Sequence, residues 1–143
     1  MNEEHQDGAL IRELANAFER YQSAHVLAND GATAVQCNIL CELLRFEGIN
    51  QKALADRLGL DKGWISRAIE PLVRDGSISK SPSELDRRGV QLTLTRSGRV
   101  RARRIERSLV EHAGRCLEAL SNDQTEVIRQ SLMLLLTAIH DSF

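Results

Sequence analysis

The chain has 143 residues, which suits one domain, and its formal net charge is only −1. That total hides a basic segment, because residues 51–107 contain 14 Lys and Arg against 7 Asp and Glu, whereas the rest contains 5 against 13. The three cysteines lack the spacing of a disulfide framework, the first residues lack the features of a secretory signal, and the longest apolar run, residues 132–139, is too short to cross a membrane. We therefore expect a soluble, cytoplasmic protein without a membrane partner.

Two amphipathic helices are predicted in the first third of the chain. Apolar residues recur at helical spacing in residues 10–21 and again in residues 37–44, and the Asn-Asp-Gly sequence at 29–31 predicts a turn between them. Gly48 is expected to end the second helix, and Asn50 to cap a third.

Residues 51–75 fit a helix-turn-helix. Counted from Gln51, Ala55 is small where two helices cross closely, and Gly59 at the ninth position supplies the left-handed conformation that ends the first helix. Asp61 is expected to cap the second helix. The apolar wedge between the two helices is formed by Leu54, Leu58, Leu60 and Ile65. An ordinary helical hairpin is the alternative, but it would not need the basic segment.

A β-hairpin and two further helices follow. Period-two alternation at residues 77–80 and 90–94 predicts two strands joined by a long loop. Thr95 is expected to cap a fifth helix that carries His112 and Cys116, and a last helix at residues 123–140 is apolar over most of its circumference. Such a helix cannot be satisfied inside so small a monomer, so the sequence favours association with a second copy.

This order of elements resembles the MarR family of bacterial transcription regulators. Its most specific parts are the Asp-Arg-Arg sequence at 86–88 and the Leu-Thr-Arg-Ser-Gly step at 94–98. The resemblance implies a mainly α winged helix-turn-helix with a small β-hairpin wing and a helical dimerisation region. It implies one domain over residues 1–143, with dimerisation helices at 1–31 and 99–143 and a DNA-binding lobe at 32–98. It further implies a homodimer that places one recognition helix per subunit in successive major grooves of double-stranded DNA.

The expected DNA contacts lie on the second helix of the helix-turn-helix and in the wing: Lys62, Gly63, Trp64, Ser66, Arg67, Lys80, Arg87 and Arg88. Arg67 is the favoured base reader, because a guanidinium pairs bidentately with guanine, whereas Ser66 and Lys62 suit phosphates. Trp64 either stacks on the nucleic acid or packs against the neighbouring helix. Pro71 removes one backbone hydrogen bond and is expected to bend the helix near Arg67.

The wing departs from the family in its charge. Asp86 is expected to buttress Arg88 by a charge-assisted pair, which leaves Arg87 to reach the minor groove or its phosphates. The tip at residues 81–85 has no positive charge, so phosphate contact by Lys80 or Arg87 is the alternative to minor-groove insertion.

Residues able to sense an effector are expected where the first, second and fifth helices meet the DNA-binding lobe: His25, Cys37, Cys41, His112 and Cys116. The helical spacing of four in both the Cys37–Cys41 and the His112–Cys116 pair would suit a metal, but these side chains also fit simple packing or a redox-sensing thiol. A small aromatic or organic acid is equally open. No metal or cofactor is assigned.

The sequence lacks a nucleophile elbow, a phosphate-binding glycine loop and a Cys-x-x-Cys pair, so we do not expect an enzyme. The favoured function is a sequence-specific regulator, a ligand- or redox-responsive repressor that binds a pseudo-palindromic operator. The alternative is a winged-helix module for protein association without specific DNA binding.

Overall fold

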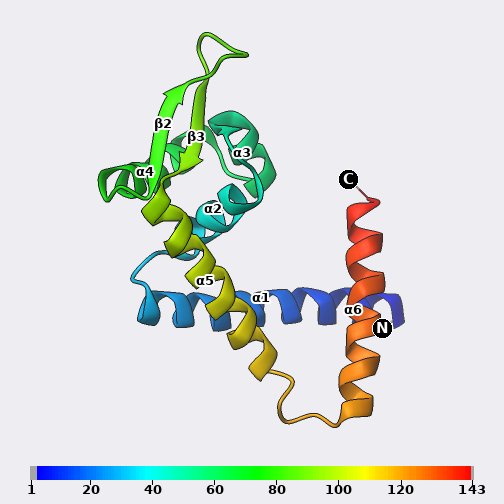
Figure 1. The fold of residues 1–143 in the computed structure, drawn as a ribbon. Coiled ribbons are helices and arrows are strands. Elements are labelled where there is room, and N and C mark those ends of the chain that lie inside the picture. Colours follow the sequence, from blue (N-terminus) through cyan, green and yellow to red (C-terminus); the bar gives the residue numbers. More distant parts are fainter. Residues whose placement is uncertain (1–2, 143) are drawn as a thin grey trace. The chain divides into compact units, whose positions relative to one another are not determined.

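The computed structural model describes residues 3–142, whose course Figure 1 shows. Met1, Asn2 and Phe143 lie outside the described residues. The first two belong to the N-terminal segment in which the sequence shows no features of a secretory signal. The described residues form six helices and one three-stranded sheet, which confirms the mainly α fold with a β wing. In chain order they are α1 (Glu3–Asn29), α2 (Ala34–Arg45), β1 (Ile49–Asn50), α3 (Gln51–Leu58), α4 (Lys62–Arg74), β2 (Ile78–Pro82), β3 (Val90–Leu94), α5 (Arg96–Arg115) and α6 (Asn122–His140). None of these described helices has the length and apolar character to span a bilayer.

The chain divides into two compact units between Leu109 and Val110. The first unit contains α1 to α4, the sheet and most of α5, and the second contains the end of α5, the following turns and α6. The expected division into dimerisation helices and a DNA-binding lobe remains a prediction, because compactness within one copy does not show which parts associate between copies.

The second helix ends earlier than predicted. α2 begins with a capping box, in which Thr33 and Gln36 satisfy each other's backbone N–H groups, and it ends at Arg45. The prediction that Gly48 ends this helix is wrong, because Phe46 already has an extended backbone. Gly48 serves the following loop, where its φ of +77° lies in the left-handed region that strains a residue with a Cβ.

The helix-turn-helix is confirmed by its caps. The Asn50 side chain accepts a hydrogen bond from Lys52 N–H at 2.9 Å at the start of α3, and Asp61 accepts one from Trp64 N–H at 2.8 Å at the start of α4. Between the two helices Gly59 is left-handed with φ of +64°. The tight turn therefore follows from three local signals, as the sequence indicates.

The sheet has one strand more than the predicted hairpin. β3 lies between β1 and β2, pairs with both in antiparallel register, and places Leu92 opposite Ile49 on one side and Lys80 on the other. β1 has only two residues and therefore shows no alternation from which the sequence could predict it. It ties the start of α3 to the base of the wing.

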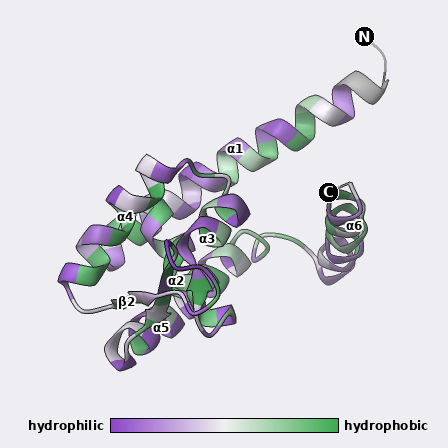
Figure 2. Ribbon diagram, turned by 90° about the horizontal axis from the view of Figure 1, so that it is seen from above, coloured by the Kyte–Doolittle hydropathy of each residue, from purple (hydrophilic) through white to green (hydrophobic). Residues whose placement is uncertain are grey.

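The core of the first unit is aliphatic. In Figure 2, hydrophobic and hydrophilic stretches alternate along α1 and α4, as expected of amphipathic helices. Leu54 and Ile65 of the predicted wedge are buried, and Leu58 and Leu60 pack against them. The largest fully buried side chains are Ile39, Leu40, Leu43, Leu54, Ile65, Ile69, Leu72, Ile78, Leu92 and Cys37.

The junction between β3 and α5 explains the Leu-Thr-x-x-Gly sequence. Thr95 caps α5 as predicted, since its hydroxyl accepts a hydrogen bond from Gly98 N–H at 3.0 Å. The same hydroxyl lies against the carbonyl oxygens of Gly76 and Ser77. Gly98 is buried directly on the main chain of Ser77, so that a Cβ at this position would overlap the Ser77 carbonyl. Only glycine allows α5 to start this close to the end of α4.

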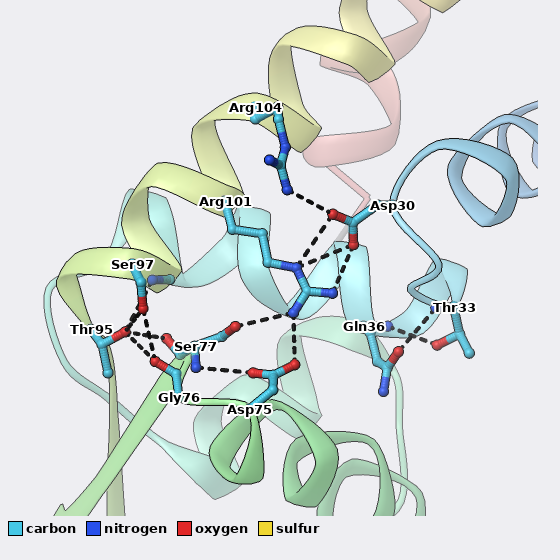
Figure 3. A network of polar contacts seen from close by, with 11 residues as sticks. Asp30, Thr33, Gln36, Asp75, Gly76, Ser77, Thr95, Ser97, Arg101 and Arg104 are labelled. Carbon is cyan, nitrogen blue, oxygen red and sulfur yellow. Dashed lines mark hydrogen bonds and ion pairs between the residues drawn. The ribbon is translucent and has the colours of Figure 1, made fainter.

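Arg101 of α5 joins three segments of the first unit (Figure 3). Its guanidinium donates to Asp30, in the α1–α2 linker, at 2.7 Å, to Asp75 at the end of α4 at 2.8 Å, and to the Ser77 hydroxyl at 3.1 Å. Arg104, one turn further along α5, donates to the second oxygen of Asp30 at 3.2 Å. The Asp30 side chain is only 9% exposed. We call these four charged residues the Arg101 network.

The network controls the ionisation of its carboxyl groups. Burial opposes the charge of Asp30, but the hydrogen bonds and charges of Arg101 and Arg104 outweigh it and lower its pKa. Burial likewise opposes ionisation of Asp75, and hydrogen bonds from Ser77 and Arg101 again give a lowered pKa. The hydrogen bond to Asp30 raises the pKa of Arg101. All members are charged at neutral pH.

The second unit is small and its long helix is not buried. α6 starts with a capping box of Ser121 and Gln124, and its predicted position is confirmed to within a residue. None of the described residues of α6 is buried. The exposed large apolar side chains on this helix are Val127, Leu132, Met133, Leu134, Leu136 and Ile139.

Arg101→Gln is expected to lower the free energy of unfolding by about 1–3 kcal/mol at pH 7, because the nearly buried Asp30 carboxylate loses its main donor. Since the folded pKa of Asp30 is lowered, this stabilisation is present above the unfolded pKa of about 3.9 and disappears as the pH falls through the lower folded value. Urea denaturation of both proteins across the acid range measures the effect. Arg103→Gln, at an exposed position of the same helix, is the control, and equal losses in both variants would contradict the prediction.

Candidate nucleic-acid interface

The start of α4 presents its polar side chains outward. Ile65, Ile69 and Leu72 anchor the opposite face of the helix in the core. Five DNA contacts are predicted on this helix. Ser66 is half-buried, and the other four are exposed: Lys62, Gly63, Trp64 and Arg67. The amphipathic pattern therefore makes these residues accessible to a ligand as large as a duplex, while their role in binding remains a prediction.

Trp64 and Arg67 form a pair on this exposed face. The guanidinium carbon of Arg67 lies 5.3 Å from the centre of the Trp64 ring, within the range of a cation–π contact. Trp64 is 55% exposed, so packing against a neighbouring helix, one of the two interpretations of this residue, does not describe its position. The indole instead supports the side chain of Arg67 along the outer surface of α4.

Pro71 lies within α4 at an exposed position. The helix continues through it to Arg74, and the Pro71 carbonyl accepts a hydrogen bond from Asp75 N–H at 2.9 Å. The expected bend near Arg67 stays a prediction.

The wing loop is closed by short-range hydrogen bonds. Ser83 N–H donates to the Gly89 carbonyl at 2.9 Å, and the Ser83 hydroxyl accepts from the N–H groups of Leu85 and Asp86 at 3.3 and 3.4 Å. Leu85 is fully exposed at the tip, and Arg87 is exposed beside it. The loop thus holds an apolar side chain, rather than a cation, at its most exposed point.

Asp86 supports Arg88 in a different way from the one predicted. Its carboxylate accepts a hydrogen bond from the backbone N–H of Arg88 at 3.0 Å. No ion pair joins the two side chains within the described part of the wing, so the expected charge-assisted buttress is wrong. The spacing of two residues favours this turn, because it brings the carboxylate to the main chain rather than to the far end of a long side chain.

The sequence suggests that Lys80 is a free cation, but in the structure it is paired. Its ammonium group pairs with the carboxylate of Glu70, which links the first strand of the wing to α4. The hydrogen bond and charge of Lys80 lower the pKa of Glu70. Both groups are partly exposed, at 30% and 52% of their side-chain surfaces.

The start of α4 and the wing line one cavity of about 450 Å³. Lys62 of α4 and Lys52 of α3 lie along this cavity together with Arg88 and Asp86 of the wing. The fold therefore brings together residues that are more than 20 positions apart in the sequence. Of the predicted cations, Lys62 and Arg88 gather in this way.

The predicted effector residues are divided between the two units: His25, Cys37 and Cys41 belong to the first, and His112 and Cys116 to the second. His25 Nε2 lies 2.7 Å from the Ser108 hydroxyl in the first unit, where Cys37 is buried and Cys41 half-buried on α2. Cys116 lies beyond the end of α5, so its prediction as a helical residue is wrong. Its N–H bonds to the Ala113 carbonyl at 3.1 Å, a tighter turn than that of an α-helix.

The chemistry of the cysteines favours packing for two of them. Burial raises the pKa of Cys37 to about 12 and that of Cys41 to about 11, with further increases from Asp30 and Glu106, respectively. A thiol becomes a good nucleophile only as the thiolate. Cys116 is exposed. Among the residues that the structure describes, no cluster of three or more His, Cys, Asp or Glu side chains could hold a metal ion.

Two groups of charged residues near this interface were missed from the sequence. Glu70 is the one acidic residue of α4, and a single carboxylate on an otherwise basic helix could have indicated from the sequence that it has a cationic partner. Asp30 and Arg101 are 71 positions apart, and Arg101 is one of many arginines in a basic segment. No local pattern identifies it as the one that pairs.

Comparison with known proteins agrees with this architecture. Residues 32–90 match the model of the MarR family. A 51-residue stretch is 39% identical to the HTH-type transcriptional regulator BilQ of Clostridium symbiosum (strain WAL-14163), covering 36% of this chain and about a third (35%) of that relative.

Solved structures match over almost the whole chain. A MarR transcriptional regulator from Methanosarcina mazei Go1 is 27% identical with a TM-score of 0.79, covering 97% of this chain and 99% of that one. Wild-type MarR from E. coli in the apo form has a TM-score of 0.83 at 24% identity, covering 90% and 95% of the two chains. The family-model match covers the helix-turn-helix and most of the wing, and the solved structures extend the similarity to the fold of almost the whole chain, which is that of the MarR winged-helix transcription regulators.

Proposed function

We propose that this regulator binds double-stranded DNA as a homodimer and acts as a repressor on a pseudo-palindromic operator. The observation that carries the proposal is the exposed start of α4, where Lys62 and Arg67 stand on a helix whose other face is fixed in the core. Arg87 and Arg88 in the wing add exposed positive charge. A mutant of E. coli MarR with a similar fold has been solved in complex with operator DNA, which supports DNA as the ligand.

The exposed apolar helices support the dimer. α6 carries six exposed large apolar side chains, and on α1 the residues Leu10, Ile11, Leu14 and Phe18 are also exposed. Apolar surface of this extent on a small protein marks an association surface. In a symmetric dimer each subunit would cover the exposed apolar surface of the other. The dimer would also present two recognition helices to the two halves of an inverted repeat.

An organic anion is the effector that the first unit favours. A cavity of about 230 Å³ lies between α1 and α5, lined by Val26, Asn29, Asp30, Arg104, Ile105 and Ser108. Arg104 is 70% exposed and can offer its remaining donors to a carboxylate. PcaV of Streptomyces coelicolor, which has a similar fold, has been solved in complex with its natural ligand.

Such an anion would act on the Arg101 network. Binding at Arg104 competes with Asp30 for that guanidinium, and Asp30 also holds Arg101, which in turn holds Asp75 at the end of α4. From Arg104, the effector would thereby reach the end of the recognition helix through three charge-assisted links, Arg104–Asp30, Asp30–Arg101 and Arg101–Asp75.

DNA affinity is expected to fall at least tenfold between low and physiological ionic strength, because several phosphates per dimer are neutralised by Lys and Arg. Fluorescence anisotropy over a salt series, on a duplex recovered by binding-site enrichment, measures this fall. The enriched sites should be inverted repeats. A protein-association module would instead bind duplexes weakly, without selecting an inverted repeat, and would elute early from heparin.

Arg67→Ala and Arg87→Ala are expected to affect binding differently. Loss of Arg67 should cost about 1–3 kcal/mol and relax the preference at one base pair per half-site, because a base contact is removed. Loss of Arg87 should weaken binding to all sequences alike, because a phosphate contact is removed. Enrichment profiles of both variants test this distinction, and equal, sequence-independent losses would exclude Arg67 as the base reader.

A variant with Cys37→Ala, Cys41→Ala and Cys116→Ser is expected to keep its release from DNA by small aromatic acids, whereas Arg104→Gln should weaken that release. The reason is that the proposed cavity contains Arg104 and no thiol. The measurement is operator binding in the presence of peroxide, zinc or aromatic acids, for variants that fold and bind DNA. A triple variant that has lost its response would instead assign sensing to a thiol.

A further inference from the structure

The carboxylate of Glu70 occupies an unusual place on the proposed DNA-binding face. It is the one acidic side chain of α4 and follows Ser66 by four residues and Arg67 by three. At 100° per residue it lies within about 60° of both around the helix axis. A negative charge therefore stands on the surface that is expected to approach the phosphates.

Glu70 of α4 pairs with Lys80 of β2. Both groups are partly exposed, and exposed ion pairs add little to the stability of a fold. Ile69, Leu72 and Ile78 already hold the two elements together in the core. The position of the pair beside the recognition residues is therefore better explained by its effect on binding than by stability.

We propose that Glu70 is a specificity-determining residue, which holds Lys80 away from the DNA backbone and disfavours sequences that offer its carboxylate no amino group. The inference rests on the proposed function. A carboxylate in the major groove accepts a hydrogen bond from the exocyclic amino group of cytosine, whereas opposite a carbonyl oxygen it is left desolvated and repelled. Specificity of this kind comes from a penalty on wrong sequences rather than from added attraction.

The pair also reduces non-specific binding. While Lys80 is neutralised by Glu70, it does not contribute the counterion release that drives sequence-independent affinity. Replacement of Glu70 by the neutral Gln frees the ammonium group for a phosphate. The variant gains affinity most on the sequences that wild type rejects.

The test compares Glu70→Gln with wild type on two duplexes of equal length, one recovered by enrichment with wild-type protein and one of random sequence. Affinity for the random duplex is expected to rise about threefold or more, and its salt dependence to steepen by roughly 0.9 in log–log slope for each phosphate gained. The enrichment profile should lose its preference at one base pair per half-site. Lys80→Gln leaves the Glu70 carboxylate without its partner, so its unscreened negative charge should lower affinity for both duplexes while the preference is kept.

Glu126→Gln is the matched control, because Glu126 also pairs with a cation, Arg129, and is 51% exposed on α6. If Glu70→Gln behaves like this control in both salt slope and enrichment profile, the inference is overturned. A loss of thermal stability in Glu70→Gln without a change in discrimination would show that the pair is structural, which also overturns it. Wild-type protein that selects no sequence would refute the proposed function itself, and the role of Glu70 with it.

Discussion

The guanidinium of Arg101 determines how the end of the recognition helix is held in the first unit. Its donors lie in one plane at fixed angles, so Asp30, Asp75 and Ser77 must keep their relative positions for all three bonds to form (Figure 3). Asp75 is the residue at which α4 ends, and Asp30 lies in the linker after α1. The polar contacts of Arg101 thus fix the end of α4, and through the rigid helix they help to orient its exposed start. The hydrophobic core alone does not provide these directional contacts.

The same network relates the proposed effector cavity to the DNA-binding face. Asp30 and Arg104 belong both to the cavity wall and to the network. An anion at Arg104 would leave the nearly buried Asp30 with fewer donors, and Arg101 would remain its principal partner. Rearrangement there changes the hydrogen bonds that Arg101 makes to Asp75. On the proposed function, this coupling would need no direct contact between ligand and α4, since Arg101 bonds to Asp30 and Asp75 at the same time.

Features set by neighbours in sequence were predictable, and features set by distant partners were not. Asn50, Asp61 and Thr95 could be identified as caps because each accepts a hydrogen bond from an N–H two or three residues away. β1 exists only through its pairing with Leu92 and Gln91 of β3, so its two residues give no pattern. The end of α5 before Cys116 and the early end of α2 were missed because helix boundaries are the least certain part of a periodicity.

The basic segment has fewer unpaired positive charges than a count of its Lys and Arg residues suggests. Lys80, Arg99 and Arg101 are each paired with a carboxylate, whereas no ion pair among the described residues involves the four remaining predicted cations of the interface, Lys62, Arg67, Arg87 and Arg88. Counterion release depends on unpaired cations, so on the proposed function these four would contribute more to the electrostatic affinity than Lys80 does. A modest number of free charges limits non-specific binding. On the proposed function, discrimination between sequences would then depend on the few groups that face the bases, the proposed carboxylate of Glu70 as well as the guanidinium of Arg67.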